Sequence, residues 1–408
     1  MYSRAVRFRS FFLAALLVLP LLAAAAAPSI AAEPLVRIEG RRFIAPDGTA
    51  LSIKGINLGN WLVPEGYMFK LQRAKSPSQI QEGFDRLLGR ERAQAFWTAF
   101  RQDYIGRDDI QFIKSVGFNT VRIPLHWRLF MDRDGTIGGE GWALLDRVLG
   151  WVREAGLYAI VDLHAAPGGQ TGYHHDDGSG YPLMFYVPRD RRLTVRLWRA
   201  IAQRYAGNPS ILGYDLLNEP IAAFHDLTTL NPKLEPFYRD VTHAIREVDP
   251  GRIVFLAAGQ WSSRFDMLGP PFAPNLAYTY HSFWSSTERD SIQRHLNFAA
   301  LHEVPLLLGE AGEFTDEWNA GFRRLHERHG IGWVFWSYKN LDTPSTVVSI
   351  PRPEGWDQVA AYIDDTRAER PSPEVIDRAM AQYLEGIRFR NGTIRWSYLN
   401  SLGLKSAP

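Results

Sequence analysis

Short apolar runs that recur along the chain constrain its fold more than any other feature. Eight such runs follow residue 50, and most of them end in a polar residue. They cover residues 51–57, 120–124, 157–162, 211–218, 253–257, 276–281, 305–310 and 331–336. Amphipathic stretches with helical period lie between most of them, for instance at 142–154, 193–205, 237–248, 292–301 and 318–329. Eight alternations of strand and helix predict an α/β fold, a (β/α)8 TIM barrel.

Two further segments flank the predicted barrel. Residues 35–54 carry short strand-like runs around the turn signal at 46–49, which predicts an N-terminal β-hairpin cap over one end of the barrel. After the eighth strand we expect a long loop at 347–366, a helix at 373–385 and a packed tail at 389–402, together a C-terminal helical tail. Because no repeat or Ser/Gly-rich linker interrupts the pattern, residues 33–408 are predicted to form a single domain.

The first 32 residues have the pattern of a cleaved export signal. Arg4, Arg7 and Arg9 precede an apolar stretch at 11–27, and small residues at 29–32 then offer a peptidase site. An uncleaved membrane anchor is the alternative, but the apolar stretch is shorter than the roughly 20 residues that a span needs. We therefore expect a periplasmic or secreted protein with no membrane contact after cleavage. The chain has no cysteine, so its stability depends on its core rather than on disulfides.

The overall charge gives no indication of a polyanionic partner. Formal net charge is +2 for 408 residues, and the three arginines of the export signal account for that excess. The remaining chain is close to neutral, and no basic stripe predicts nucleic-acid binding. We expect a monomer.

Two glutamates stand where buried strands end. The run at 211–217 leads directly into Asn218 and Glu219 and is stopped by Pro220, while the run at 304–309 ends in Glu310. An unpaired charge is expensive in such a place, so a functional role is favoured over an ordinary salt bridge. Functional residues of barrels gather at the carboxyl ends of the strands. Two carboxylates on two strand ends indicate glycoside hydrolysis.

Other polar residues fit the same rim. Arg122 lies inside an apolar strand and needs an acidic partner; a nucleophilic carboxylate would be one, and the arginine would depress its pKa. His164 and His281 end the third and sixth strands, where they would bind sugar hydroxyls rather than serve only as core histidines. Trp336 ends the eighth strand and offers a flat apolar face on which a pyranose ring can stack.

One cluster raises the question of a metal. It is His174-His175-Asp176-Asp177, but consecutive residues cannot easily all point at one ion, and the glycines around it indicate a solvated loop. Zinc-hydrolase spacing, a Walker loop and the dinucleotide fingerprint are all missing from the sequence. We predict neither a metal site nor a cofactor.

Taken in order, Arg122, His164, Asn218-Glu219-Pro220, His281, Glu310 and Trp336 resemble glycoside hydrolase family 5, whose members are retaining barrel glycosidases. The resemblance spans roughly residues 51–336. It implies that Glu219 is the acid/base, that Glu310 is the nucleophile and that Asn218 donates to the sugar 2-hydroxyl. The segments 55–65 and 162–170 are similar to the exo-β-1,3-glucanase branch, in which the residue matching Glu65 contacts the terminal sugar.

Two positions depart from the family pattern. The family's His-x-Tyr is here His281-Ser282-Phe283, so the hydroxyl expected near the nucleophile is missing or is supplied by Tyr280 or another residue. The segment after Glu310 brings a rival carboxylate, Glu313. Glu310 is preferred because it directly follows the strand.

By this resemblance the chain is expected to be an exported retaining β-glycosidase acting on an oligo- or polysaccharide, a β-glucan or β-glucoside, in the manner of an exo-β-1,3-glucanase. An endo-acting β-1,4-glucanase or a mannanase is the alternative within the same class. A catalytically weak carbohydrate-binding barrel is the alternative from another class, and retention of both glutamates argues against it.

Overall fold

Eight parallel strands close into a barrel, which confirms the fold predicted from the alternating pattern. Their order around the barrel is β10-β3-β4-β5-β6-β7-β8-β9. The strands are β3 (Lys54–Asn57), β4 (Thr120–His126), β5 (Tyr158–Ala165), β6 (Ile211–Asp215), β7 (Ile253–Ala257), β8 (Leu276–His281), β9 (Leu306–Glu310) and β10 (Gly332–Phe335). Helices cover the outer face of such a barrel and strand side chains fill its interior, and β4 and β6 to β10 are buried along their whole length.

The computed structural model describes residues 1–2, 5, 34–365 and 367–405. The predicted export signal at 1–32 therefore lies outside the described residues, apart from three positions. Within the described part, no helix combines the length and the hydropathy that crossing a bilayer requires.

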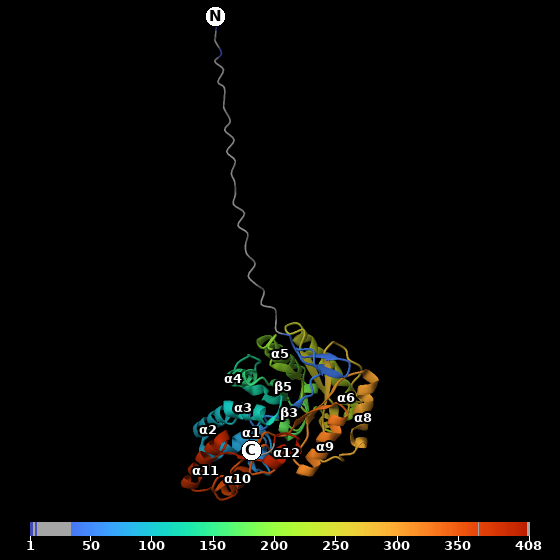
Figure 1. The fold of residues 1–408 in the computed structure, drawn as a ribbon. Helices are drawn as coiled ribbons and strands as arrows, with labels where there is room; N and C mark the ends of the chain where they lie inside the picture. The colour runs from blue at the N-terminus through green and yellow to red at the C-terminus, as the bar shows by residue number, and fades with distance from the viewer. Residues whose placement is uncertain (3–4, 6–33, 366, 406–408) are drawn as a thin grey trace. The chain divides into compact units, whose positions relative to one another are not determined.

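Twelve α-helices are present among the described residues, most of them around the barrel (Figure 1). They are α1 (Pro77–Leu88), α2 (Arg90–Asp103), α3 (Arg107–Val116), α4 (Gly141–Glu154), α5 (Pro188–Arg204), α6 (Leu227–Arg246), α7 (Gly259–Ser262), α8 (Gln293–His302), α9 (Asp316–Arg328), α10 (Trp356–Asp364), α11 (Pro373–Gly386) and α12 (Trp396–Ser401). All five helices predicted between the strands are found. Helix α6 begins ten residues earlier than expected, because Asp226 caps it and the helix continues through Pro232 and Pro236.

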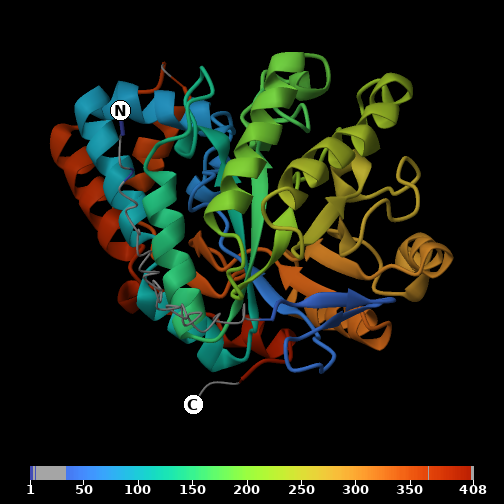
Figure 2. The same cartoon turned by 90° about the horizontal axis from the view of Figure 1, so that it is seen from above.

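The N-terminal hairpin closes the end of the barrel at which the strands begin. Strands β1 (Arg37–Glu39) and β2 (Arg42–Ile44) pair antiparallel, and Figure 2 shows the pair as dark blue arrows at one end of the strands. Val36 and Phe43 join an apolar cluster with inward residues of the barrel strands, among them Ile160, Leu212 and Phe255. The predicted cap is thus present: the chain turns at 46–49, as expected, where Ile44 bridges to Ala50, and a second tight turn at Gly40 joins β1 to β2.

The C-terminal tail is more ordered than the sequence predicted. Residues 347–366, expected to be a loop, contain strand β12 (Val348–Ile350) and helix α10. Strand β12 pairs with β11 (Lys339–Leu341) and β13 (Thr393–Ile394) in a small three-stranded sheet. Helix α10 forms because Trp356 and Val359 find a buried surface next to α1, and α10 and α11 lie beside α1 and α2 in both views (Figures 1 and 2).

Candidate active site

A cavity of about 580 Å³ lies at the carboxyl ends of the barrel strands, a size in the usual range for ligand pockets. Seven of the eight site residues predicted from the sequence line it, and the eighth, Arg122, lies beneath its floor. The lining residues are Glu65, Tyr67, His164, Tyr173, His175, Asn218, Glu219, Gln260, Trp261, Ser263, His281, Ser282, Phe283, Trp284, Glu310, Glu313 and Trp336. Among the described residues, the lining includes no lysine or arginine.

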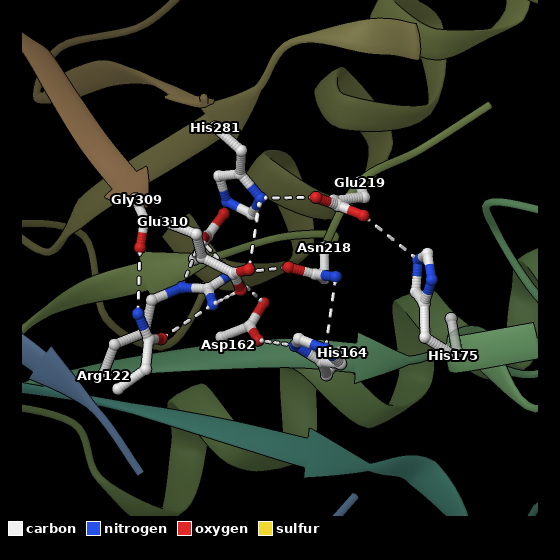
Figure 3. A network of polar contacts seen from close by, with 12 residues as sticks. Arg122, Asp162, His164, His175, Asn218, Glu219, His281, Gly309 and Glu310 are labelled. Atoms are coloured by element: carbon white, nitrogen blue, oxygen red, sulfur yellow. Dashed lines mark hydrogen bonds and ion pairs between the residues drawn. The ribbon is translucent and has the colours of Figure 1, made fainter. Parts of the chain in front are cut away.

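Arg122 is the centre of a fully buried ion network (Figure 3). Its Nη1 lies 2.6 Å from Oε1 of Glu310, and its Nη2 lies 3.0 Å from Asp162 and 2.9 Å from Asp215. The same guanidinium donates to the side-chain oxygens of Asn57 and Asn218, each at 3.0 Å. Five acceptors therefore surround one cation, which fixes its plane at the bottom of the pocket.

Arg122 lowers the pKa of its partner Glu310, as expected, but burial outweighs it in the net shift. Burial raises the pKa of Glu310 to about 8, although Arg122 by itself lowers that pKa. Burial is the largest cause, and Asp162 and Asp215, which share the single charge of Arg122, add to the rise; burial raises their own pKa values to about 7. Conversely, although burial opposes the charged form of Arg122, the three carboxylates raise its pKa.

His164 links this network to Asn218. Its Nδ1 lies 2.8 Å from Oδ2 of Asp162, and its Nε2 lies 3.3 Å from Nδ2 of Asn218. Burial and the nearby Arg122 keep the pKa of His164 well below its ordinary value, so the ring is neutral. Because Arg122 donates to Oδ1 of Asn218, the Nδ2 of that amide group points away from Arg122, next to Nε2 of His164.

Glu219 follows β6 on a strained backbone. Its φ is +46°, a left-handed conformation that non-glycine residues adopt rarely and mainly at functional sites. Nδ1 of His281 lies 2.9 Å from Oε1 of Glu219, and Nε2 of His175 lies 3.3 Å from Oε2 (Figure 3). Burial, with Glu310 and Glu65 nearby, raises the pKa of Glu219 well above its ordinary value. This shift favours the protonated form of the Glu219 carboxyl group, which lies between two imidazoles.

One wall of the pocket is built by η1 (Gly66–Phe69) and the residues next to it. Glu65 is 8% exposed, and burial raises its pKa well above the ordinary value, with Glu310 and Glu313 contributing. Trp336 donates its Nε1–H to the hydroxyl of Tyr67 at 2.7 Å, and Tyr67 also hydrogen-bonds to Glu313. Burial raises the pKa of Glu313 to about 7. Of the two rival carboxylates, Glu310 is the one that Arg122 contacts.

Phe283 lines the pocket, at the position where the family pattern has a tyrosine. Tyr280, suggested above as a substitute donor, cannot fill that role. Its ring stacks on His295 of α8, with ring centroids 4.0 Å apart, and on His326 of α9. Successive side chains of a strand point to opposite faces, so Tyr280 points to the helical layer while His281 points inward.

The loop at 171–180 is not the solvated loop that the sequence indicated. Oxygens of Asp176 accept the backbone N–H groups of Thr171, Gly172 and Gly178 at 2.7 to 2.8 Å, and both His175 and Asp176 are buried. Asp177 turns away from Asp176 to Ser78 and Arg128. These carboxylates shape the loop, and they do not converge on one point.

A different group has the spacing of metal ligands. One ligand atom each from Glu219, His281 and Glu310 lies within 4.8 Å of the others. The resemblance assigns Glu219 and Glu310 to catalysis, and His281 was predicted to bind the substrate; the contacts of His281 with both glutamates and of Glu310 with Arg122 account for the arrangement.

Among the polar residues of the site that sequence reasoning missed are Asn57, Asp162, His175 and Asp215. Asp162 and Asp215 did leave a signal, because each is a charge inside an otherwise apolar strand, as Arg122 is. His175 left no such signal in the sequence, because its position depends on how the loop folds over Glu219.

Comparisons with known proteins agree with this geometry. Residues 88–342 match the family described as "Cellulase (glycosyl hydrolase family 5)". A β-xylosidase of Phanerodontia chrysosporium is 30% identical over 61% of this chain and 52% of its own length. A glucan 1,3-beta-glucosidase of Candida oleophila is 32% identical over 54% of this chain and 53% of its own. The chain spans about half the length of these curated relatives.

Among solved structures, an endogalactoceramidase is similar in fold, with a TM-score of 0.62 and 17% sequence identity. The match covers 90% of this chain and 84% of that one. At such identity the likeness concerns the fold alone.

Proposed function

This chain belongs to the cellulase family, glycosyl hydrolase family 5, and from that premise we propose that it is a retaining β-glycosidase acting on a β-glucan or β-glucoside. The observation that carries the proposal is the spacing of the two glutamates: an oxygen of Glu219 and an oxygen of Glu310 lie within 4.8 Å of each other. Retaining enzymes hold their carboxyl groups about 5–5.5 Å apart, whereas inverting enzymes need about 6.5–9.5 Å to admit a water molecule.

The surroundings of the two carboxyl groups support different roles for them. Glu310 contacts Arg122 at 2.6 Å, whereas the partners of Glu219 among the described residues are two histidines whose pKa values burial holds well below the ordinary value. Although burial raises the pKa of both glutamates, the cation beside Glu310 favours its ionised form, so we infer that Glu310 ionises before Glu219. The singly ionised pair has Glu310 as nucleophile and Glu219 as acid.

The reaction then proceeds in two steps. Glu310 attacks the anomeric carbon, the bond to the leaving oxygen breaks, and the proton of Glu219 moves to that oxygen. Glu219, now ionised, takes a proton from water, which attacks the anomeric carbon and releases Glu310 from the ester. Nδ2 of Asn218 would donate to the sugar 2-hydroxyl in the transition state, since Arg122 holds its other end.

The substrate class rests on the names of the relatives and on the pocket wall. Two of the relatives named above act, by their names, on glucan 1,3-β-linkages or on xylosides. Glu65 and the loop at 171–180 stand at the cavity, where they would enclose a terminal sugar and favour exo action. Trp336 would stack on that sugar.

We further propose that the protein is exported and acts as a monomer. The support is the arginine-led apolar stretch of residues 1–32, whose small residues fit cleavage after Ala32. Mass spectrometry of the N-terminus of protein recovered outside the cytoplasm tests cleavage, and light scattering tests the monomer.

The catalytic assignment is tested by anion rescue. Glu310→Ala should abolish hydrolysis of an activated aryl β-glucoside with an unchanged circular dichroism spectrum, and azide should partly restore cleavage. Because azide would attack from the face that the carboxylate vacated, the product should be the α-glucosyl azide. Glu313→Ala is the matched control and should remain active without azide. Rescue in Glu313→Ala with an active Glu310→Ala would reverse the assignment.

A further inference from the structure

The loop at 171–180 presents one side chain, that of His175, to the acid/base carboxyl group. Asp176 is 1% exposed and binds three backbone N–H groups of the loop, so it folds the loop around η3 (His174–Asp176). His175 follows His174 in this turn, and it alone of the two histidines lines the cavity. Its Nε2 lies 3.3 Å from Oε2 of Glu219 and 3.2 Å from the hydroxyl of Thr171.

The two oxygens of Glu219 have different neighbours. Nδ1 of His281 lies 2.9 Å from Oε1 of Glu219. The other ring nitrogen of His281, the buried Nε2, has no hydrogen-bond partner among the described residues. A buried N–H without an acceptor costs more than an unused lone pair, so the hydrogen belongs on Nδ1, which donates to Oε1. The exchangeable proton of Glu219 is thus left to Oε2, the oxygen next to His175.

We propose that His175 is a positioning residue for Glu219, which orients Oε2 and stabilises the ionised carboxylate in the second step of the reaction. The inference rests on the proposed function. While Glu219 is protonated, the Nε2–H of His175 donates to the Thr171 hydroxyl. Once the proton has moved to the leaving oxygen, the same N–H donates to Oε2, and it is released when Glu219 takes a proton from water. No change of tautomer is needed.

His175 acts as a dipole and not as a charge. Burial, then the neighbouring His164 and His174, hold its pKa well below the ordinary value, so it stays neutral through the cycle. Glu219 is faced by charged and titratable groups from several elements: Glu65 before η1, Arg122 of β4, Asp162 and His164 of β5, His175 of the loop, His281 of β8 and Glu310 of β9. Of these, only His175 and His281 contact the Glu219 carboxyl group in the described structure.

The experiment uses three variants of the full chain. His175→Phe keeps a buried ring and removes both nitrogens. His175→Gln restores an N–H near the position of Nε2. His174→Phe is the matched control, since His174 is adjacent, half-buried and outside the cavity lining.

The substrate is 2,4-dinitrophenyl β-glucoside, whose leaving group needs no acid. Its kcat/KM reports attack by Glu310, and its kcat reports hydrolysis of the ester, for which Glu219 must act as base. In His175→Phe we expect kcat to fall about tenfold to a hundredfold, within the range that general acid–base catalysis contributes. We expect kcat/KM to change less than about twofold, His175→Gln to recover most of kcat, and His174→Phe to resemble the wild type.

A pH profile gives the second readout. On a glucoside with a poor leaving group, the basic limb of kcat/KM reports the pKa of Glu219. Loss of a donor to the ionised form raises that pKa, so this limb should move to higher pH in His175→Phe and return in His175→Gln. Equal losses of kcat and kcat/KM in both His175 variants, with an unmoved limb, would overturn the proposal and leave His175 a packing residue. A wild type that forms no glycosyl-enzyme would instead refute the proposed function.

Discussion

At the scale of single residues, Arg122 determines the electrostatics of the site because three carboxylates share its one positive charge. The backbone positions of Asp162 and Asp215 face each other across β5 and β6, and both side chains contact the guanidinium that also contacts Glu310. Each additional anion makes ionisation of Glu310 less favourable, and the pKa of Glu310 rises accordingly. Removing one competing anion should therefore make the nucleophile ionise at lower pH.

Asp215→Asn tests this sharing. Asp215 raises the pKa of Glu310, so its neutralisation should lower that pKa, and the acidic limb of kcat/KM should move to lower pH by about one unit, equivalent to about 1.4 kcal/mol. Asp249→Asn is the control, since Asp249 pairs with the buried Arg252 at 2.9 Å but lies outside the cavity lining. A limb that stays in place, or moves to higher pH, in an active Asp215→Asn enzyme would contradict the shared-charge explanation.

Phe283 offers a second test of the nucleophile. It lines the cavity, and Tyr280 points to the helices, so no hydroxyl from these two residues reaches Glu310. In Phe283→Tyr an added donor should stabilise ionised Glu310, lower its pKa and shift the acidic limb of kcat/KM downward. Tyr280→Phe should leave that limb unmoved. If Phe283→Tyr is folded and active with the wild-type profile, Phe283 does not occupy the family's tyrosine position.

At the scale of secondary-structure elements, the two ends of the barrel carry separate tasks. The strands begin against the hairpin, where Phe43 is 5% exposed and its ring centroid lies 5.9 Å from that of Phe255. They end at the cavity, where the polar residues gather. Stability and catalysis should therefore respond to different substitutions, as expected for this fold.

Phe43→Ala should lower the free energy of unfolding by about 3 kcal/mol, because it removes a buried aromatic ring and leaves a cavity. Since the hairpin is at the far end from Glu219 and Glu310, kcat/KM measured well below the melting transition should remain that of the wild type. Denaturant unfolding and steady-state kinetics on the same preparation give both values. Phe224→Ala, which truncates a phenylalanine that is 59% exposed, should leave the free energy of unfolding unchanged. A large loss of kcat/KM in folded Phe43→Ala would mean that the two ends are coupled.

At the scale of the whole molecule, the loops between strands determine the shape of the cavity. The segment after β3 supplies Glu65 and Tyr67, the loop after β5 supplies Tyr173 and His175, and the segment after β8 supplies Trp284. A cavity walled by several separate loops should hold a chain end better than the middle of a polymer.

The products of laminarin digestion test whether the cavity holds a chain end. We expect glucose to dominate the products at early times, because one end of the bound chain would meet the wall that contains Glu65. Chromatography of the first few per cent of conversion would reveal the pattern, with Glu310→Ala as the blank. Long oligosaccharides at early times, or a rapid fall in viscosity of a 1,4-linked glucan, would favour the endo-acting alternative.

The sequence by itself determined the barrel and the placement of most site residues on its rim. Strand and helix periodicities are local, and so is the place where an apolar run ends in Asn218-Glu219 or in Glu310. Parallel strands share one carboxyl edge, so residues at strand ends must meet. The same local logic failed for residues 347–366, because α10 forms where Trp356 can stack on Tyr383 of α11 and donate to the Phe69 carbonyl.

Only the tertiary structure decided the electrostatics of the site. Whether Arg122 serves one carboxylate or three depends on the register that sets Asp162 opposite Asp215, and register is a relation between strands far apart in sequence. The net direction of the pKa shift of Glu310 depends on how completely water is excluded, which no single segment fixes. His175 reaches Glu219 because Asp176 folds its loop inward. Contacts of this kind are long-range, and a sequence read locally does not contain them.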